Sequence, residues 1–167
     1  AALVNDQYQA VRLPYEQSSF AMLVIMPTGD FRTFENELGD ELDDIFEAID
    51  ASPAYVQLGM PKFKTESKFS LADQLKALGM ELPFDPNYAD FSGITGVKDL
   101  FISDAIHQAF IDVNEQGTEA AAATAVAAKM TSLPGDSYEI KLDHPFIYVI
   151  YDQETNTIVF MGRVLAP

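Results

Sequence analysis

The side chains that most often carry enzymatic chemistry are scarce in this chain. Its 167 residues include two histidines, His107 and His144, and no cysteine. A serine hydrolase needs a nucleophile, a histidine base and an orienting acid, and neither histidine lies in a recognisable nucleophile context. The sequence also lacks a Gly-x-Ser-x-Gly elbow, a phosphate-binding loop and paired metal-ligand spacings. We therefore expect no enzymatic activity, no cofactor and no metal.

Residues 117–132 suggest a different kind of chemistry, the addition of a strand to a sheet. Alanine dominates the segment, and by propensity alone it would be a surface helix or a flexible loop. Its even positions, however, are small and uncharged, whereas both charges, Glu119 and Lys129, fall on odd positions. A strand would therefore present one face without a charge to bury, and a helix would have no clean apolar stripe. The alternation favours an insertable strand, although alanine has poor strand propensity.

The overall charge limits the classes of partner. Twenty-six acidic and ten basic residues leave a net charge of −16, which would repel nucleic-acid phosphates. No apolar run reaches the roughly 18 residues that a membrane span needs. About half of the residues, 48%, are apolar, which favours a folded domain over disorder. We expect one domain, with neither nucleic acid nor membrane as a partner.

The elements that must position residues 117–132 are predicted to be mainly strands. Alternation over residues 8–15 and a continuous apolar run over 20–26 predict an antiparallel hairpin. Three more strands are predicted at 138–142, 146–151 and 157–164, the last two joined as a hairpin. Residues 54–68 should be extended, with Pro61 at an edge or a bulge. Residues 100–113 mix helical and extended spacing, and we predict a strand near their C-terminal end.

Two helices are predicted after the first hairpin. Phe31, Phe34 and Leu38 have helical spacing, and Gly39 should end that helix. Asp40 can then cap a second helix whose apolar stripe ends at residue 49.

A shorter helix is predicted over residues 70–78. Ser70 and Asp73 form a capping pattern at its start, and Gly79 is placed to end it. Residues 83–95 should form a loop, with Phe91 as an anchor into the core.

Several motifs together identify a family. The run Asn114-Glu115-Gln116-Gly117-Thr118-Glu119-Ala120-Ala121-Ala122-Ala123-Thr124 resembles the hinge of the reactive-centre loop of inhibitory serpins. Six further segments agree with the family in order and spacing: Leu13-Pro14-Tyr15, Phe34-Glu35-Asn36-Glu37-Leu38, Met60-Pro61-Lys62-Phe63, Asp90-Phe91-Ser92-Gly93-Ile94, Asp143-His144-Pro145-Phe146 and Phe160-Met161-Gly162-Arg163-Val164. The resemblance covers about residues 8–167 and implies the α+β serpin fold. It also implies that residues 1–167 are the C-terminal part of a single serpin domain, of prokaryotic type, without its N-terminal helices and remaining main-sheet strands.

The resemblance implies a suicide-substrate inhibitor of serine proteases. In that mechanism a protease attacks the loop, and the cleaved loop inserts into the main sheet and traps the acyl-enzyme. The hinge would comprise Glu115, Gly117, Thr118, Glu119, Ala120, Ala121, Ala122, Ala123 and Thr124. The family's count from the hinge glycine places the reactive bond between Thr131 and Ser132, with Met130 second and Lys129 third as the residue before the bond. Thr131 or Met130 would suit elastase-like or subtilisin-like targets, and Lys129 a trypsin-like one.

Other residues receive structural roles from the resemblance. Lys62 and Glu115 match an ion pair at the breach, where insertion starts, although two unrelated surface charges are the alternative. His107 matches the shutter beneath the opening strands, and His144 is expected to be structural.

The resemblance also bears on partners and compartment. The partners would be the target protease and the N-terminal part of the same serpin. An extracellular or periplasmic location is slightly favoured. The second functional hypothesis is a non-inhibitory serpin that acts as a binding or carrier protein.

Overall fold

The computed structural model describes residues 1–115, 117–118 and 136–167. The chain divides into two compact units. The first unit comprises Ala1–Phe63 and Asp112–Pro167, and the second comprises Lys64–Ile111.

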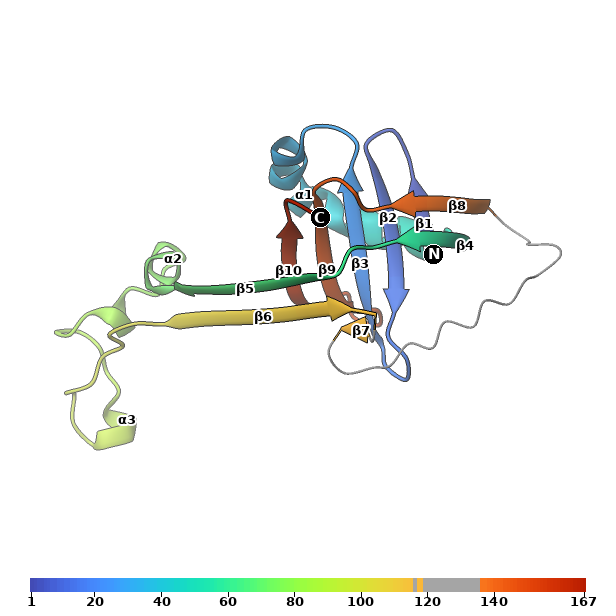
Figure 1. Ribbon diagram of the computed structural model, residues 1–167. Helices are drawn as coiled ribbons and strands as arrows, with labels where there is room; N and C mark the ends of the chain where they lie inside the picture. Colours follow the sequence, from blue (N-terminus) through green and yellow to red (C-terminus); the bar gives the residue numbers. More distant parts are fainter. Residues whose placement is uncertain (116, 119–135) are drawn as a thin grey trace. The chain divides into compact units, whose positions relative to one another are not determined.

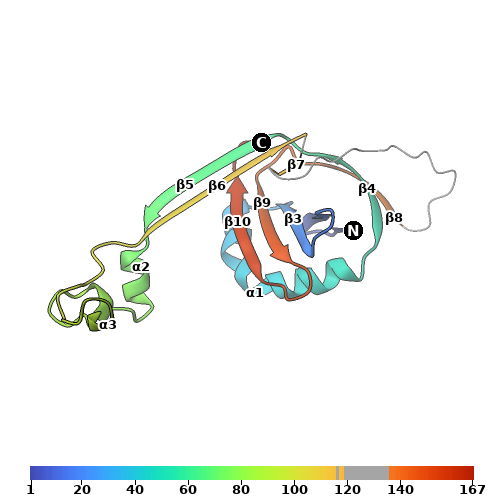
Figure 2. The ribbon, with the colours of Figure 1, turned by 90° about the horizontal axis from the view of Figure 1, so that it is seen from below.

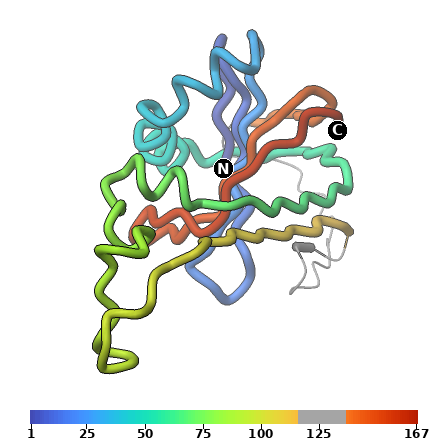
Figure 3. The backbone as a smooth tube through the Cα atoms, turned by 90° about the vertical axis from the view of Figure 1, so that its left-hand side faces the viewer, coloured from blue at the N-terminus to red at the C-terminus, as the bar shows by residue number. Residues whose placement is uncertain are grey.

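A five-stranded antiparallel sheet is the centre of the first unit (Figure 1). Its order is β1 (Ala2–Val4), β2 (Tyr8–Pro14), β3 (Phe20–Pro27), β9 (Phe146–Asp152) and β10 (Ile158–Val164). The predicted hairpins β2–β3 and β9–β10 are both present, and the tube in Figure 3 follows the β2–β3 hairpin in blue. The apolar runs of β3 and β9 pair in the middle of the sheet, where both faces are covered.

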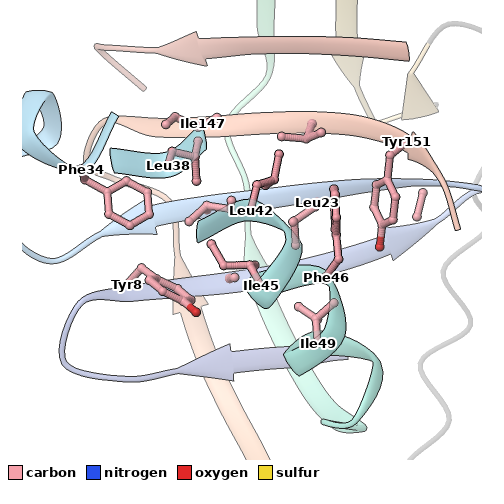
Figure 4. Close-up of a cluster of buried hydrophobic side chains, with 14 residues drawn as sticks. Tyr8, Leu23, Phe34, Leu38, Leu42, Ile45, Phe46, Ile49, Ile147 and Tyr151 are labelled. Atoms are coloured by element: carbon pink, nitrogen blue, oxygen red, sulfur yellow. The ribbon is translucent and has the colours of Figure 1, made fainter. Parts of the chain in front are cut away.

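Helix α1 (Phe31–Asp50) lies across one face of this sheet (Figure 2). The apolar face of α1 is buried against the inward side chains of β2, β3 and β9 (Figure 4). This face consists of Phe34, Leu38, Leu42, Ile45, Phe46 and Ile49. Asp30 caps the helix, because its carboxylate accepts hydrogen bonds from the amide and the hydroxyl of Thr33. These two hydrogen bonds lower the pKa of Asp30.

The prediction that Gly39 ends a helix is wrong, because α1 continues through it to Asp50. A glycine inside a helix costs roughly 0.5–1 kcal/mol relative to alanine. Leu38 and Leu42, on either side of Gly39, are both buried against the sheet and belong to one continuous stripe. Their burial outweighs the glycine, so Asp40 lies within the helix and caps nothing.

The segment predicted as extended over residues 54–68 is two strands in two different sheets. Strand β4 (Ala54–Gly59) pairs in parallel with β8 (Asp136–Lys141), and β5 (Phe63–Ser70) pairs elsewhere. Pro61 lies between the two strands and not within either, because a proline cannot donate to a ladder. The predicted edge or bulge position is therefore corrected to a strand junction.

A separate, three-stranded sheet has the order β5, β6 (Ile106–Asn114) and β7 (Gly117–Thr118). Strand β6 confirms the prediction of a strand near the end of residues 100–113. Strands β5 and β6 run side by side in Figures 1 and 3.

The remaining elements of the second unit are short. They are α2 (Ala72–Ala77), a 3-10 turn η1 (Leu82–Phe84) and α3 (Ser92–Thr95). Gly79, with a φ of 99°, follows α2 and marks its end as predicted.

Two predictions for the second unit need correction. The hydroxyl of Ser70 accepts a hydrogen bond from the Ala72 amide, but Leu71 occupies the cap position and no side chain caps α2. Ser70 instead donates a hydrogen bond to Asp104, ahead of β6. Phe91 is only half-buried, whereas Phe84 and Ala89 are the buried residues of the predicted loop region. The apolar residues of a short loop compete for one small interior, and spacing alone does not reveal which of them enters it.

Candidate functional site

The candidate site is the start of the predicted reactive loop, where β6 ends. Lys62, at the junction of β4 and β5, places its Nζ 2.8 Å from Oε1 of Glu115, which follows β6. The hydrogen bond from Lys62 lowers the pKa of Glu115. Both side chains are largely exposed, at 65% and 74%, so the pair contributes little to stability by itself. The two side chains form an ion pair, and the assignment of this pair to the breach, where loop insertion would start, stays a prediction.

Strand β7 continues the chain directly after this ion pair. Thr118 pairs with Val113 and Gly117 with Asn114, in antiparallel register. In the sheet order β5-β6-β7, these two residues of the predicted hinge lie on the edge of β6 that is opposite β5. The backbone at residues 117–118 therefore forms an added strand on the sheet.

Most of the predicted loop lies outside the described residues. This applies to Glu119, Ala120, Ala121, Ala122, Ala123 and Thr124 of the hinge, and to Lys129, Met130, Thr131 and Ser132 around the reactive bond. The chain is described again from β8, which starts at Asp136 beside β4.

The two histidines are both on the surface. His107 in β6 is exposed, and its ring centroid lies 5.3 Å from that of Phe69 in β5. Its role in a shutter stays a prediction. His144 Nδ1 lies 2.7 Å from Oδ1 of Asp143, and this hydrogen bond lowers the pKa of Asp143.

An aromatic contact behind the ion pair was not singled out from the sequence. Phe63, next to Lys62, packs against Phe146 and Tyr148 of β9, and Tyr148 lies against Gly162 of β10. A glycine inside a strand often marks a close approach of this kind, so Gly162 was the available signal. The partner of Gly162 could not be read from spacing.

The described part of the chain holds neither a recognisable metal-ion cluster nor a membrane-spanning helix. Among residues 1–115, 117–118 and 136–167, no group of three acidic or histidine side chains could hold a metal ion. None of the helices described there is long and apolar enough to cross a membrane.

Comparison with known proteins decides the family. The model of the serpin family, described as serine protease inhibitors, matches residues 2–167. The chain belongs to the serpin family. It is 43% identical over 168 residues to an uncharacterized serpin-like protein of Thermococcus kodakarensis, covering 98% of this chain and 38% of that protein. It is 38% identical to a leukocyte elastase inhibitor of Xenopus laevis, covering 94% of this chain and 42% of the relative.

Solved serpin structures share the fold. The native structure of the thermophilic serpin tengpin matches with a TM-score of 0.75 and 29% identity, over 99% of this chain and 44% of that one. A thyroxine-binding globulin in complex with thyroxine matches with the same TM-score and 25% identity, over 99% and 43%. The chain thus has the serpin type of α+β fold, and it spans about two-fifths of the length of the curated relatives it matches. A serpin named as an elastase inhibitor and a serpin named as a thyroxine-binding globulin are thus both similar to it.

Proposed function

We propose that this serpin is a suicide-substrate inhibitor of serine proteases, and that residues 1–167 supply its reactive loop and hinge. The position of β7 carries the proposal. Its two residues extend β6 by an antiparallel strand on the edge where a longer inserted strand would continue. The permissive composition of residues 118–124 supports the same step, because a buried charge or a large side chain would oppose entry into the sheet.

The proposed reaction needs no catalytic group from this chain. The protease serine attacks the carbonyl carbon of Thr131, the bond to Ser132 breaks and the amine of Ser132 leaves. The acyl-enzyme then travels with the loop as the loop enters the sheet. Residues 117–131 would span about 46 Å as a strand at about 3.3 Å per residue. That length is comparable to a small domain, so the protease would be carried far from its starting position.

Target choice follows from the residue before the broken bond. Thr131 or Met130 in that position fits the pocket of an elastase-like or subtilisin-like protease, and Lys129 fits a trypsin-like one. The similarity to a leukocyte elastase inhibitor supports the first assignment.

A binding or carrier function is the second candidate. It is favoured by the similarity to thyroxine-binding globulin, which was solved with thyroxine bound. The hinge argues against it, since residues 118–124 carry no large side chain and Glu119 is their single charge.

The N-terminal part of the same serpin is a further proposed partner. The relatives are more than twice as long as this chain, and their additional residues would supply strands next to β6.

Incubation with proteases tests the proposal directly. The full-length serpin is mixed with elastase, subtilisin and trypsin in separate reactions, and the products are separated on denaturing gels. A covalent complex that resists SDS supports inhibition, and mass spectrometry of the released C-terminal peptide identifies the broken bond. Loop cleavage with full protease activity and no complex would refute it.

Substitution of the first inserting side chain tests the insertion step. Thr118→Arg should convert the inhibitor into a substrate, because an arginine would have to be buried as the strand enters. Thr118→Val is the matched control, since it is similar in size and uncharged. An unchanged stoichiometry of inhibition in Thr118→Arg would contradict insertion.

A further inference from the structure

Three aromatic rings meet at Phe63, the residue that follows Lys62 in the chain. The ring centroid of Phe63 is 5.6 Å from that of Phe146, edge-on at 74°, and 5.2 Å from that of Tyr148, tilted at 37°. Both separations are in the range of favourable aromatic contacts. Phe146 and Tyr148 are buried in β9, at 0% and 4% exposed. The first residue of β5 is therefore fastened to the central sheet of the first unit.

The ring of Tyr148 is itself held in one place by Gly162. The two residues are directly opposite each other in the β9–β10 pairing. A Cβ atom on Gly162 would overlap the hydroxyl and the ring of Tyr148, so the tyrosine side chain occupies the space that a side chain at position 162 would fill. From this position Tyr148 contacts Phe63.

Within the described residues, the ion pair is less enclosed than these rings. Lys62 and Glu115 are both exposed, and an exposed pair of long side chains loses entropy when it is held in one geometry. Such a pair forms well only if the backbone already brings the two side chains together. Phe63 is covalently next to Lys62, so its packing fixes the position of the Lys62 backbone relative to the first unit.

We propose that Phe63, held by Phe146 and by Tyr148 on Gly162, is a positioning residue for the Lys62–Glu115 ion pair and thereby for the first hinge residues. The proposed chain of contacts starts with Gly162 of β10 and Tyr148 of β9 and reaches Phe63 at the junction of β4 and β5. From there it continues through Lys62 to Glu115, which lies between β6 and β7. The consequence for inhibition rests on the proposed function, whereas the coupling between Phe63 and the ion pair does not.

A purely structural role for Phe63 predicts different behaviour. In that case removal of the ring lowers stability and leaves the ion pair unchanged. A positioning role predicts that removal of the ring weakens the contact between Lys62 and Glu115, which raises the pKa of Glu115. The same change should follow from removal of the Lys62 charge.

The test compares four forms of the full-length serpin: wild type, Phe63→Ala, Lys62→Met and the double variant. The pKa of Glu115 is measured by carbon NMR on labelled glutamate. We expect it to rise in both single variants and to rise no further in the double variant. Additive rises, or no rise in Phe63→Ala, would overturn the proposal.

Two further variants protect the test against unfolding and non-specific effects. Phe63→Leu keeps an apolar side chain and should give a smaller rise in the pKa of Glu115 than Phe63→Ala. Phe69→Ala removes a phenylalanine ring from the far end of the same strand, where it contacts His107, and should leave that pKa unchanged. A rise in Phe69→Ala equal to that in Phe63→Ala would also overturn the proposal.

The stoichiometry of inhibition provides the second measurement. If Phe63 positions the hinge, Phe63→Ala and Lys62→Met should each raise the stoichiometry severalfold, and the double variant should match the larger single effect. If the wild type forms no covalent complex, the proposed function fails. The NMR comparison then still decides the positioning role.

Discussion

The two units of the chain differ in how they bury their apolar residues. In the first unit, α1 and the five-stranded sheet enclose a continuous core that includes Leu23, Phe46 and Tyr151. In the second unit, the described residues bury only Phe84, Ala89 and Ile111, and large apolar side chains such as Leu78 and Ile94 are exposed, at 84% and 76%. The first unit therefore has the interior of an independent fold. The second has an apolar surface of the kind that another part of a protein covers.

This difference fits the place of the chain in the serpin family. The relatives are more than twice as long, and we propose that their additional residues cover the second unit. The predicted reactive loop begins after β6, whose C-terminal residues belong to the first unit.

The largest expected effect on stability comes from removing an aromatic ring from the core of the first unit. Phe46 is 1% exposed, and its ring is stacked on Tyr151 with centroids 4.3 Å apart. Phe46→Ala should lower the free energy of unfolding of the full-length serpin by about 3–5 kcal/mol. Because we propose that additional residues of the full-length serpin cover the second unit, Leu78→Ala, just after α2, should also lower it, by about 2 kcal/mol or more. Denaturant unfolding measures both, and a change at Leu78 of less than about 0.5 kcal/mol would show that this surface stays uncovered.

A smaller effect on stability should distinguish a closely packed glycine, Gly162, from an exposed one, Gly39, within the first unit. Gly162→Ala should lower the free energy of unfolding by about 1–3 kcal/mol, because the added methyl group collides with Tyr148. Gly39→Ala should raise it by about 0.5–1 kcal/mol, because the methyl group meets open space on an exposed helical position. Thermal unfolding of the two variants measures the difference, and equal signs would contradict the tight packing assigned to β9 and β10.

The smallest effect concerns a polar cluster in the second unit. Hydrogen bonds from the side chains of Lys98 and Ser92, and from the Ser92 amide, lower the pKa of Asp90 from 3.8 to about 2. Because the folded-state pKa is depressed, the stabilisation is present above pH 3.8 and is lost as the pH falls through about 2. The protection of the Ser92 amide, measured as its exchange rate relative to the intrinsic rate at the same pH, should therefore fall over that interval. Lys98→Met should move the onset to higher pH, while Lys76→Met should not move it.

Several elements could be predicted because their signal is local. The apolar runs of β3 and β9 are long enough for strands and too short for most helices, and the turns after them are polar. Gly79 was placed correctly, since a helix end with positive φ selects glycine. The serpin resemblance rested on ordered motifs, and the family match over residues 2–167 confirms it.

Other features could not be predicted because they depend on burial against distant residues. Gly39 appeared to be a helix end, yet the sheet beneath α1 stabilises the helix on both sides of it. Phe91 was expected in the core, but the fold buries Phe84. The cap at Ser70 failed because its hydroxyl donates to Asp104, far along the chain.

The amino-acid sequence by itself determined the family, the strand hairpins and the small side chains that predominate in the predicted hinge. These depend on residue types and on periodicities over a few positions. Tertiary structure alone decided that Phe63 packs against Phe146 and Tyr148, that β7 pairs with β6 on the edge opposite β5, and that Tyr148 lies on Gly162. The geometry of these contacts is set by strand register and by the packing of side chains between strands, which local patterns do not specify.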